Sequence, residues 1–343
     1  MDAVYQNVIN YDRARLESVV PLETPYSMFI DPSSLCNFRC VFCAMHGGKE
    51  PPPFKKQLMS FELFKKAVDD VKQFRNPLKK LRLSHYGEPL LNPHFPEMAS
   101  YAKKAGIAEH IEVVTNGSLL NPELNKRIAD SGIDRIRISV EALDSEGYRR
   151  VSGVKLDMDQ YINNIRDLYE RCDKCEIYCR TVDISVSTQE DRMRFFELFH
   201  DVCDKYYIDN VIPLWAGFDE INNVKDFSAA ESEAGAHGQE LQDVMICPVP
   251  FYTMTVHADG EVGLCCADWR RELKFGNICC DSLKNIWNSK KVRDFWLVQA
   301  EGKRDTIGVC RKCLNPVYDC LDNLDPYREQ LVSRLKNANQ TKL

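Results

Sequence analysis

The 343-residue chain lacks the features that would place it in a membrane, outside the cell or on a nucleic acid. No apolar run approaches the roughly 20 residues that a membrane-spanning helix needs. Residues 1–20 contain acids and lack the apolar core of a secretory signal peptide. The net charge of -6 does not favour a nucleic-acid partner, because such surfaces are normally basic. We therefore expect a cytoplasmic protein with neither a membrane nor a nucleic-acid partner.

Cysteine, in contrast, is abundant. The chain has 15 cysteines and no export signal. A reducing cytosol disfavours structural disulfides, so clustered cysteines indicate metal binding. The odd number also argues against a complete disulfide framework.

Residues 26–216 alternate extended apolar stretches with amphipathic ones. Six stretches are predicted strands: 26–31, 79–86, 110–115, 134–142, 176–185 and 210–216. Five stretches between them have helical spacing: 60–74, 92–106, 121–132, 156–172 and 188–206. This alternation predicts a parallel α/β sheet with right-handed crossovers, either flat or curved into a barrel. In both forms, chemistry is expected at the carboxyl ends of the strands.

The rest of the chain divides by composition. Residues 1–25 form an N-terminal extension, and the polar segment 217–246 is predicted to be a linker. Residues 247–320 form a second cysteine-rich region, and 321–343 are a charged tail that is predicted to be helical.

The first unusual loop, SSLCNFRCVFCAMHG, directly follows the first predicted strand. Cys36, Cys40 and Cys43 have C-x3-C-x2-C spacing, and three such thiolates can bind three corners of a cubane [4Fe–4S] cluster. The fourth iron has no ligand within the motif, and an open metal position suits a reacting ligand. The competing interpretations are a zinc site, for which His46 is the nearby fourth ligand, and unconnected core cysteines.

With aromatic Phe42 just before its last cysteine, this loop resembles that of the radical S-adenosylmethionine (SAM) superfamily. The resemblance covers about residues 26–216 and implies a partial (β/α)6 barrel with a [4Fe–4S] cluster and SAM as cofactors. It also implies reductive cleavage of SAM to a 5′-deoxyadenosyl radical, which abstracts hydrogen from a substrate C–H bond. An external one-electron reductant such as flavodoxin or ferredoxin would be the redox partner.

The resemblance also implies a SAM pocket at the strand ends. Its residues are Phe42 against the adenine, Gly87, Glu88 and Pro89 at the amino group, Ser139 at the ribose, and Thr115 and Asn116 as further candidates. The chain has HYGEP where many relatives have GGEP, which changes one loop residue and keeps the glutamate.

The second cysteine-rich region resembles the SPASM and shorter twitch domains that follow radical SAM barrels. Full SPASM domains carry two auxiliary clusters and need more late cysteines than this chain has. We therefore predict one auxiliary [4Fe–4S] cluster on Cys247, Cys265, Cys310 and Cys313, with Cys320 as a possible substitute ligand. A zinc ribbon on the same four cysteines is the alternative.

Cys266 is a candidate catalytic residue because it directly follows a predicted ligand. The related anaerobic sulfatase-maturating enzymes place a catalytic aspartate there, and a thiol can donate a hydrogen atom to a substrate radical. A structural or ligand role is the alternative. Asp268 is the second catalytic candidate, and four residues are weaker candidates for the pocket lining: Arg180, Trp215, Asp219 and His257.

The remaining cysteines are interpreted as buried free thiols: Cys172, Cys175, Cys179, Cys203, Cys279 and Cys280.

Two enzymatic functions and one non-catalytic function fit these motifs. The first is dehydrogenation or epimerisation at a carbinol carbon of a sugar- or aminocyclitol-type small molecule. The second is modification of a peptide or protein side chain; the 35 residues before Cys36 are few for a leader-binding domain, which favours the first. The third, an iron–sulfur electron carrier, would not need the SAM-pocket loops.

Overall fold

The computed structural model describes residues 3–5, 14–48, 50–212, 234–236 and 238–340. Its ten strands form one sheet in the order β1-β7-β6-β5-β4-β3-β2-β8-β9-β10. The strands are β1 (Val4–Tyr5), β2 (Ser27–Ile30), β3 (Leu78–Arg82), β4 (Ala108–Thr115), β5 (Arg135–Ser139), β6 (Glu176–Val182), β7 (Lys205–Asp209), β8 (Thr253–Val256), β9 (Glu261–Gly263) and β10 (Gly276–Asn277).

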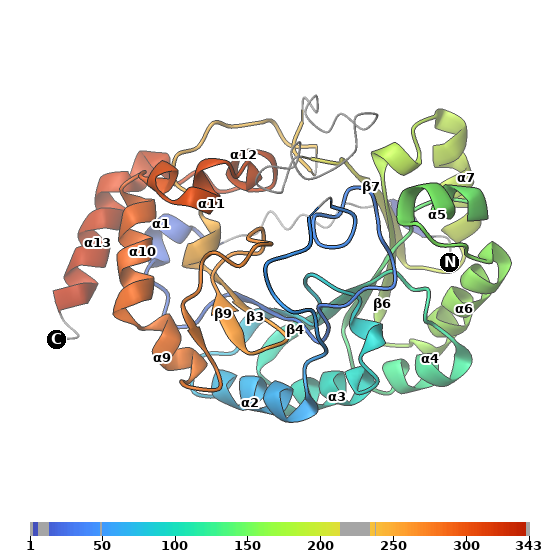
Figure 1. Cartoon of the computed structure of the whole chain (residues 1–343), viewed down its shortest axis with the longest axis horizontal. Helices are drawn as coiled ribbons and strands as arrows, with labels where there is room; N and C mark the ends of the chain where they lie inside the picture. The colour runs from blue at the N-terminus through green and yellow to red at the C-terminus, as the bar shows by residue number, and fades with distance from the viewer. Residues whose placement is uncertain (1–2, 6–13, 49, 213–233, 237, 341–343) are drawn as a thin grey trace.

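Helices cover the convex side of this sheet and both of its ends (Figure 1). Along the barrel they are α1 (Leu16–Val19), α2 (Phe61–Val71), η1 (Pro89–Leu91), α3 (Phe95–Ala105), α4 (Pro122–Ala129), α5 (Ser145–Ser152), α6 (Met158–Arg171), η2 (Asp183–Ser185) and α7 (Gln189–Phe199). The C-terminal part contains η4 (Val249–Phe251), α9 (Leu283–Trp287), α10 (Lys290–Ala300), η5 (Arg304–Thr306), α11 (Gly308–Arg311), α12 (Asn315–Tyr318), η6 (Asp325–Tyr327) and α13 (Arg328–Gln340). No described helix is both long and apolar enough to span a bilayer.

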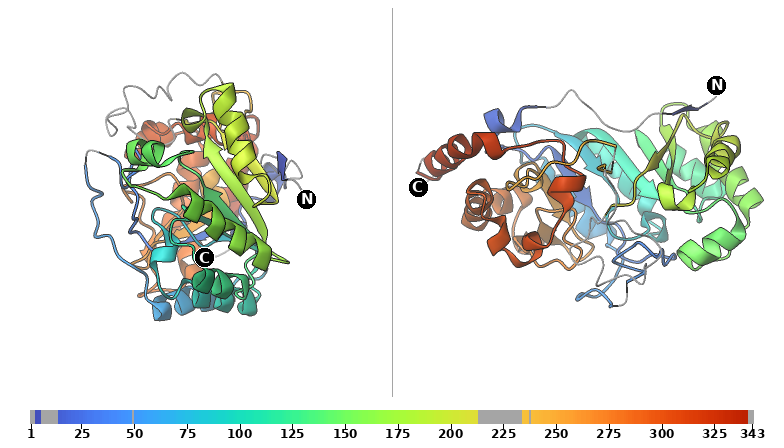
Figure 2. Two further views of the ribbon diagram at one scale, coloured as in Figure 1. Left: turned by 90° about the vertical axis from the view of Figure 1, so that its right-hand side faces the viewer. Right: turned by 90° about the horizontal axis from the view of Figure 1, so that it is seen from above.

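The predicted partial barrel is confirmed. Strands β2 to β7 pair in parallel and in chain order. The sheet is curved, and within the described residues β1 and β10 are its edges, so it does not close (Figures 1 and 2). The C-terminal segment lies at the β2 end of the sheet, opposite α5 to α7.

The faces of the sheet differ in chemistry because side chains alternate along each strand. Leu81, Ile111 and Ile136 are almost fully buried in the core under the helices. Their neighbours Arg82 and Glu112 lie on the concave face, where ion pairs connect adjacent strands. The barrel interior is therefore polar and charged.

The last barrel strand was predicted too late in the chain. We placed it at 210–216, whereas β7 spans Lys205–Asp209, and residues 213–216 lie outside the described residues. The predicted helix 188–206 was correspondingly too long, because α7 ends at Phe199. Asp204 turns the chain into the strand: its carboxylate accepts the Ile177 N–H at 2.7 Å. The pattern of apolar residues continues past this turn, so helical spacing alone did not reveal it.

The junction between the two cysteine-rich regions was not predicted. Strand β8 pairs in parallel with β2 over four residues, and β9 and β10 continue the same sheet. The second cysteine-rich region is thus hydrogen-bonded to the first strand of the barrel. The first cysteine loop follows β2, whereas Cys247 precedes β8 and Cys265 follows β9, which is antiparallel to β8.

Candidate active site

The first cysteine loop is held in place by backbone contacts with two other segments. The Glu88 N–H donates to the Leu35 carbonyl at 2.8 Å, which joins the GEP loop to the start of the cysteine loop. Arg39 and Val41 donate to the carbonyls of Ser152 and Val151 at the end of α5, both at 2.9 Å. The loop thus has fixed anchors before and between its cysteines.

Two glycines allow the chain segments of this loop to approach closely. A Cβ at Gly87 would lie 2.1 Å from the Ser33 carbonyl oxygen, and one at Gly47 would lie 1.9 Å from the Cys40 carbonyl oxygen. Gly87 was predicted as part of the GEP motif. Gly47 was missed, although its position four residues after the last cysteine was the available signal.

The three thiols fit a cluster site by their chemistry and placement. Burial raises the pKa of all three, to about 12 for Cys36, and their mutual repulsion adds to the shift in Cys36 and Cys40. Thiolates in such a place need a positively charged partner, which bound iron supplies. Cys36, Cys40 and Cys43 would hold the cluster.

His46 is not placed as a zinc ligand. Its Nε2–H donates to the Tyr86 carbonyl at 3.1 Å, and its Nδ1 accepts from Lys56 at 3.0 Å, so both ring nitrogens are engaged. Burial and the Lys56 charge lower the pKa of His46 to about 4. Within the described part of the chain, no three His, Cys, Asp or Glu side chains form a ready single-ion site.

The structure brings Glu88, Thr115 and Asn116 together from two loops. The Glu88 carboxylate accepts the Thr115 hydroxyl at 2.6 Å, the Asn116 N–H at 2.7 Å and the Leu90 N–H at 3.0 Å. Despite these bonds, burial raises the pKa of Glu88 to about 7. Asn116 Nδ2 lies 4.0 Å from the Cys36 sulfur, which places this group beside the cysteine loop.

The remaining predicted SAM residues frame the same end of the sheet. Ser139 ends β5 and is buried, Pro89 begins η1, and Phe42 is half-buried in the cysteine loop. Sequence reasoning missed Glu141, two residues beyond Ser139. Its carboxyl is buried near the three thiols, whose pKa values it raises, and burial also raises the pKa of Glu141 itself. The available signal was the acid in the SVEA loop.

The second cysteine set also comes together. Besides burial, the nearby Cys247 thiol raises the pKa of Cys265, Cys310 and Cys313, whereas a hydrogen bond with Cys320 lowers the pKa of Cys247 itself. Cys320 lies within hydrogen-bonding reach of the Cys247 thiol. Five thiols are thus available where four were predicted to bind a cluster, and they fit it as a donor set.

The two catalytic candidates occupy different environments. Cys266 is half-buried, and its carbonyl accepts the His85 Nε2–H at 3.0 Å. Burial raises the pKa of its thiol to about 12, and nearby Asp319 and Arg82 influence it in opposite directions. Cys266 therefore lies next to the charged barrel interior. Asp268 instead caps a turn by accepting the N–H groups of residues 272 and 273 at 3.1 and 2.7 Å.

The four weaker candidates for the pocket lining lie in different parts of the chain. His257 directly follows β8, is buried, and stacks on His85 at 5.7 Å between ring centroids. Arg180 lies on β6 in register with Ser139. Trp215 and Asp219 lie outside the described residues.

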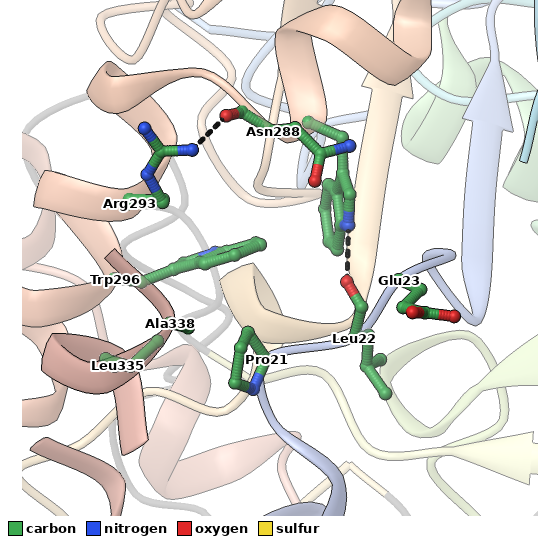
Figure 3. A pocket seen from close by; sticks show the side chains of 9 residues that line it. Pro21, Leu22, Glu23, Asn288, Arg293, Trp296, Leu335 and Ala338 are labelled. Carbon is green, nitrogen blue, oxygen red and sulfur yellow. Dashed lines mark hydrogen bonds between the residues drawn. The ribbon is translucent and has the colours of Figure 1, made fainter. Parts of the chain in front are cut away.

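A separate cavity of about 210 Å³ lies at the far end of the molecule (Figure 3). Its lining includes Pro21, Trp296 and Leu335, and none of the predicted site residues. The Arg293 side chain binds the Asn288 carbonyl there. This cavity lies where α10 and α13 pack near the N-terminal segment.

Comparison with known families decides the general assignment. The family model of the radical SAM superfamily matches residues 30–199, and the SPASM model, an iron–sulfur cluster-binding domain, matches 247–314. The chain belongs to the radical SAM superfamily. The family matches confirm the predicted cofactors: a [4Fe–4S] cluster, SAM and auxiliary iron–sulfur binding. Which residues of this radical SAM enzyme hold them stays a prediction.

Individual relatives are more distant. A tungsten-containing aldehyde ferredoxin oxidoreductase cofactor-modifying protein of Pyrococcus furiosus is 32% identical over 116 residues, or 34% of this chain and 31% of that protein. A GTP 3′,8-cyclase of Nostoc sp. is 31% identical over 118 residues, covering 34% and 35% of the two chains. The aligned part thus spans about a third of these relatives.

Two solved structures share the fold. BtrN in complex with AdoMet and 2-DOIA gives a TM-score of 0.54 at 17% identity, over 87% of this chain and 96% of that chain. Streptococcus suis SuiB bound to S-adenosylmethionine gives 0.61 at 15% identity, over 87% and 74%. Another SuiB structure is bound to the precursor peptide SuiA. The fold therefore does not choose between small-molecule and peptide substrates.

Proposed function

We propose that this radical SAM enzyme dehydrogenates a carbinol carbon of a sugar- or aminocyclitol-like small molecule. The observation that carries the proposal is the position of Cys266. This residue follows a thiol of the second cysteine set and lies beside Arg82 on the barrel interior. An auxiliary cluster on that set would therefore border the space in which a substrate binds.

Different residues of the protein take different parts in this reaction. When bound, the first cluster and SAM supply the radical that removes the carbinol hydrogen. Glu88 holds the two loops of the SAM pocket together through three hydrogen bonds and orients the methionine amino group. Cys247, Cys265, Cys310 and Cys313 would hold the auxiliary cluster, which would supply an acceptor for the second electron, and the substrate's hydroxyl proton would leave to solvent.

Epimerisation differs in the role of Cys266. In an epimerase, the substrate radical regains a hydrogen atom from a thiol on the opposite face. Because thiol protons exchange with solvent, the product made in deuterated water would carry one deuterium at the inverted carbon. In a dehydrogenase, the product has two hydrogens fewer than the substrate, and no solvent hydrogen enters at that carbon.

The test is turnover in deuterated water by the reconstituted enzyme, with mass spectrometry of the product of a sugar or aminocyclitol that stimulates 5′-deoxyadenosine formation. We expect an oxidised product without solvent deuterium, and turnover by Cys266→Ala within about threefold of wild type. Cys279→Ala, which removes an exposed cysteine, is the matched control. A deuterated isomer that Cys266→Ala no longer forms would show an epimerase. Stimulation by peptides alone would contradict the small-molecule assignment.

A further inference from the structure

The concave face of the barrel carries more positive than negative charge. Six basic side chains lie on it, from β3, β5, β6 and β7: Lys80, Arg82, Arg135, Arg137, Arg180 and Lys205. The carboxylates that pair with them are Glu112, Glu176 and Asp209. The ion-pair network of this face therefore has three positive charges in excess, and the nearby Glu141 carboxyl, whose charge also acts on Arg180, offsets part of this excess.

The excess is concentrated around one carboxylate. Glu112 contacts Arg82 at 2.6 Å, Arg137 at 3.3 Å, Lys80 at 3.8 Å and Arg135 at 3.9 Å. Burial and the neighbouring guanidinium groups lower the pKa of Lys80 to about 8, although the Glu112 charge acts in the opposite direction. The single negative charge of Glu112 therefore does not neutralise the four cationic side chains around it.

The cations are exposed to the interior, whereas the central carboxylate is not. The Glu112 side chain is 1% exposed, compared with 22% for Arg82, 13% for Arg137 and 28% for Arg180. A molecule entering the barrel would meet guanidinium groups lying over a buried carboxylate. The field at this surface attracts anions.

Arg137 has unused hydrogen-bonding capacity. Its Nε is buried and has no hydrogen-bond partner among the described residues. Its other donors make only long bonds, at 3.4 Å to the Tyr207 hydroxyl and 3.3 Å to Glu112. A planar guanidinium with free donors suits a carboxylate or phosphate, which it can bind through two parallel hydrogen bonds.

These arginines lie between the two predicted cofactor sites. Arg180 is in register with Ser139 of the SAM pocket, and Arg82 lies beside Cys266. A substrate whose C–H bond faces SAM and whose radical faces the second cysteine set must occupy this space. We propose that the substrate carries an anionic group, a carboxylate or a phosphate ester, that Arg82, Arg137 and Arg180 bind. This inference rests on the proposed function and narrows its substrate to sugar acids or sugar phosphates.

The test measures anion binding by calorimetry on the reconstituted, SAM-bound full chain. The probes are gluconate and inorganic phosphate, with glucose as the neutral control. We expect saturable binding of at least one anion, at least tenfold tighter than that of glucose. Arg137→Gln should weaken this binding at least tenfold, and Arg137→Lys, which keeps the charge but cannot form two parallel hydrogen bonds, should bind with an affinity between those of Arg137→Gln and wild type. Arg137 is the chosen site because Glu112 keeps its other cations when Arg137 is changed.

The matched control is Arg166→Gln on the outer helix α6, where Arg166 pairs with Asp201 at 2.7 Å. Thermal unfolding of each variant checks that it folds. Failure of both anions to bind, or undiminished binding by folded Arg137→Gln, would overturn the inference, as would equal weakening by Arg166→Gln. Tighter binding of an acidic hexapeptide than of gluconate or phosphate would contradict the assignment of a small-molecule substrate.

The same samples separate this inference from the proposed function. Dithionite-driven cleavage of SAM, measured without any sugar, reports the radical chemistry alone. Cleavage without anion binding would refute only the anionic substrate. Anion binding without cleavage would refute the proposed function and leave the binding site standing. Selective binding of gluconate would indicate a sugar acid, and selective binding of phosphate a phosphate ester.

Discussion

Glu88 combines a buried position with a role that needs its ionised form. Burial raises its pKa to about 7 even though three donors bind its carboxylate. Below that pH the ligand-free protein holds a proton on Glu88, and this proton must leave before both oxygens can accept hydrogen bonds from the SAM amino group. SAM binding should therefore weaken as pH falls.

We expect SAM affinity to fall by up to tenfold per pH unit below about pH 7, and to lose this Glu88-dependent slope in Glu88→Gln. Glu88→Gln should also bind SAM more weakly at pH 8 while iron content is unchanged. Equilibrium binding of SAM between pH 5.5 and 8.5 measures both effects. An identical pH profile in wild type and variant would show that Glu88 does not contact SAM.

At the scale of single residues, sequence motifs predicted those site residues that lie close together in the chain. Cys36, Cys40 and Cys43 share one loop, so their spacing alone brings them near one another. Glu141 was missed because its position near these thiols depends on contacts distant in sequence: the cysteine loop rests on the end of α5, through Ser152. No local pattern encodes that contact.

At the scale of elements, the cysteine loop depends on Gly47. An alanine Cβ there would overlap the Cys40 carbonyl, so the backbone next to a predicted ligand must move. We expect Gly47→Ala to lose most iron at the first site and at least tenfold in SAM cleavage, while the second site keeps its iron. Iron analysis and 5′-deoxyadenosine assays measure these losses.

Gly106→Ala is the control for this variant. Gly106 has a left-handed φ of 63°, but no atom lies within 4 Å of the added Cβ. Its replacement should cost about 1 kcal/mol of unfolding free energy through backbone strain, with no change in iron. Equal iron loss in both variants would mean that general destabilisation, and not the close contact, explains the result.

The elements themselves were predicted unevenly. Strands β2 to β6 were predicted because apolar extended stretches alternate with amphipathic helices. β7 was misplaced because Asp204, which lies directly before the strand and five residues beyond the end of α7, is fixed by a contact with Ile177 of β6, which is a tertiary interaction. The pairing of β8 with β2 joins residues more than 200 positions apart and has no local signature.

At the scale of the whole molecule, one sheet carries both cysteine sets. The first cysteine loop follows β2, and Cys247 and Cys265 flank the hairpin of β8 and β9, which pairs with β2 through β8. Tyr86 and Trp269 pack together with Met45 in a small buried cluster that Cys43 borders, and the Tyr86 hydroxyl lies near Cys265. The two sites are therefore connected by packed side chains. We expect each site to bind its cluster independently of the other, and both clusters to take part in turnover.

Iron content tests this division of the molecule. Two cubane clusters require about eight iron and eight sulfide per chain after anaerobic reconstitution. Replacing Cys36, Cys40 and Cys43 together by alanine should remove about half of the iron and all SAM cleavage. Replacing Cys310 and Cys313 should remove the other half and leave dithionite-driven SAM cleavage in place, because the first loop has its own anchors. Zinc in place of the second half of the iron would show a zinc ribbon, and SAM cleavage by the triple variant would contradict the assignment of the catalytic cluster.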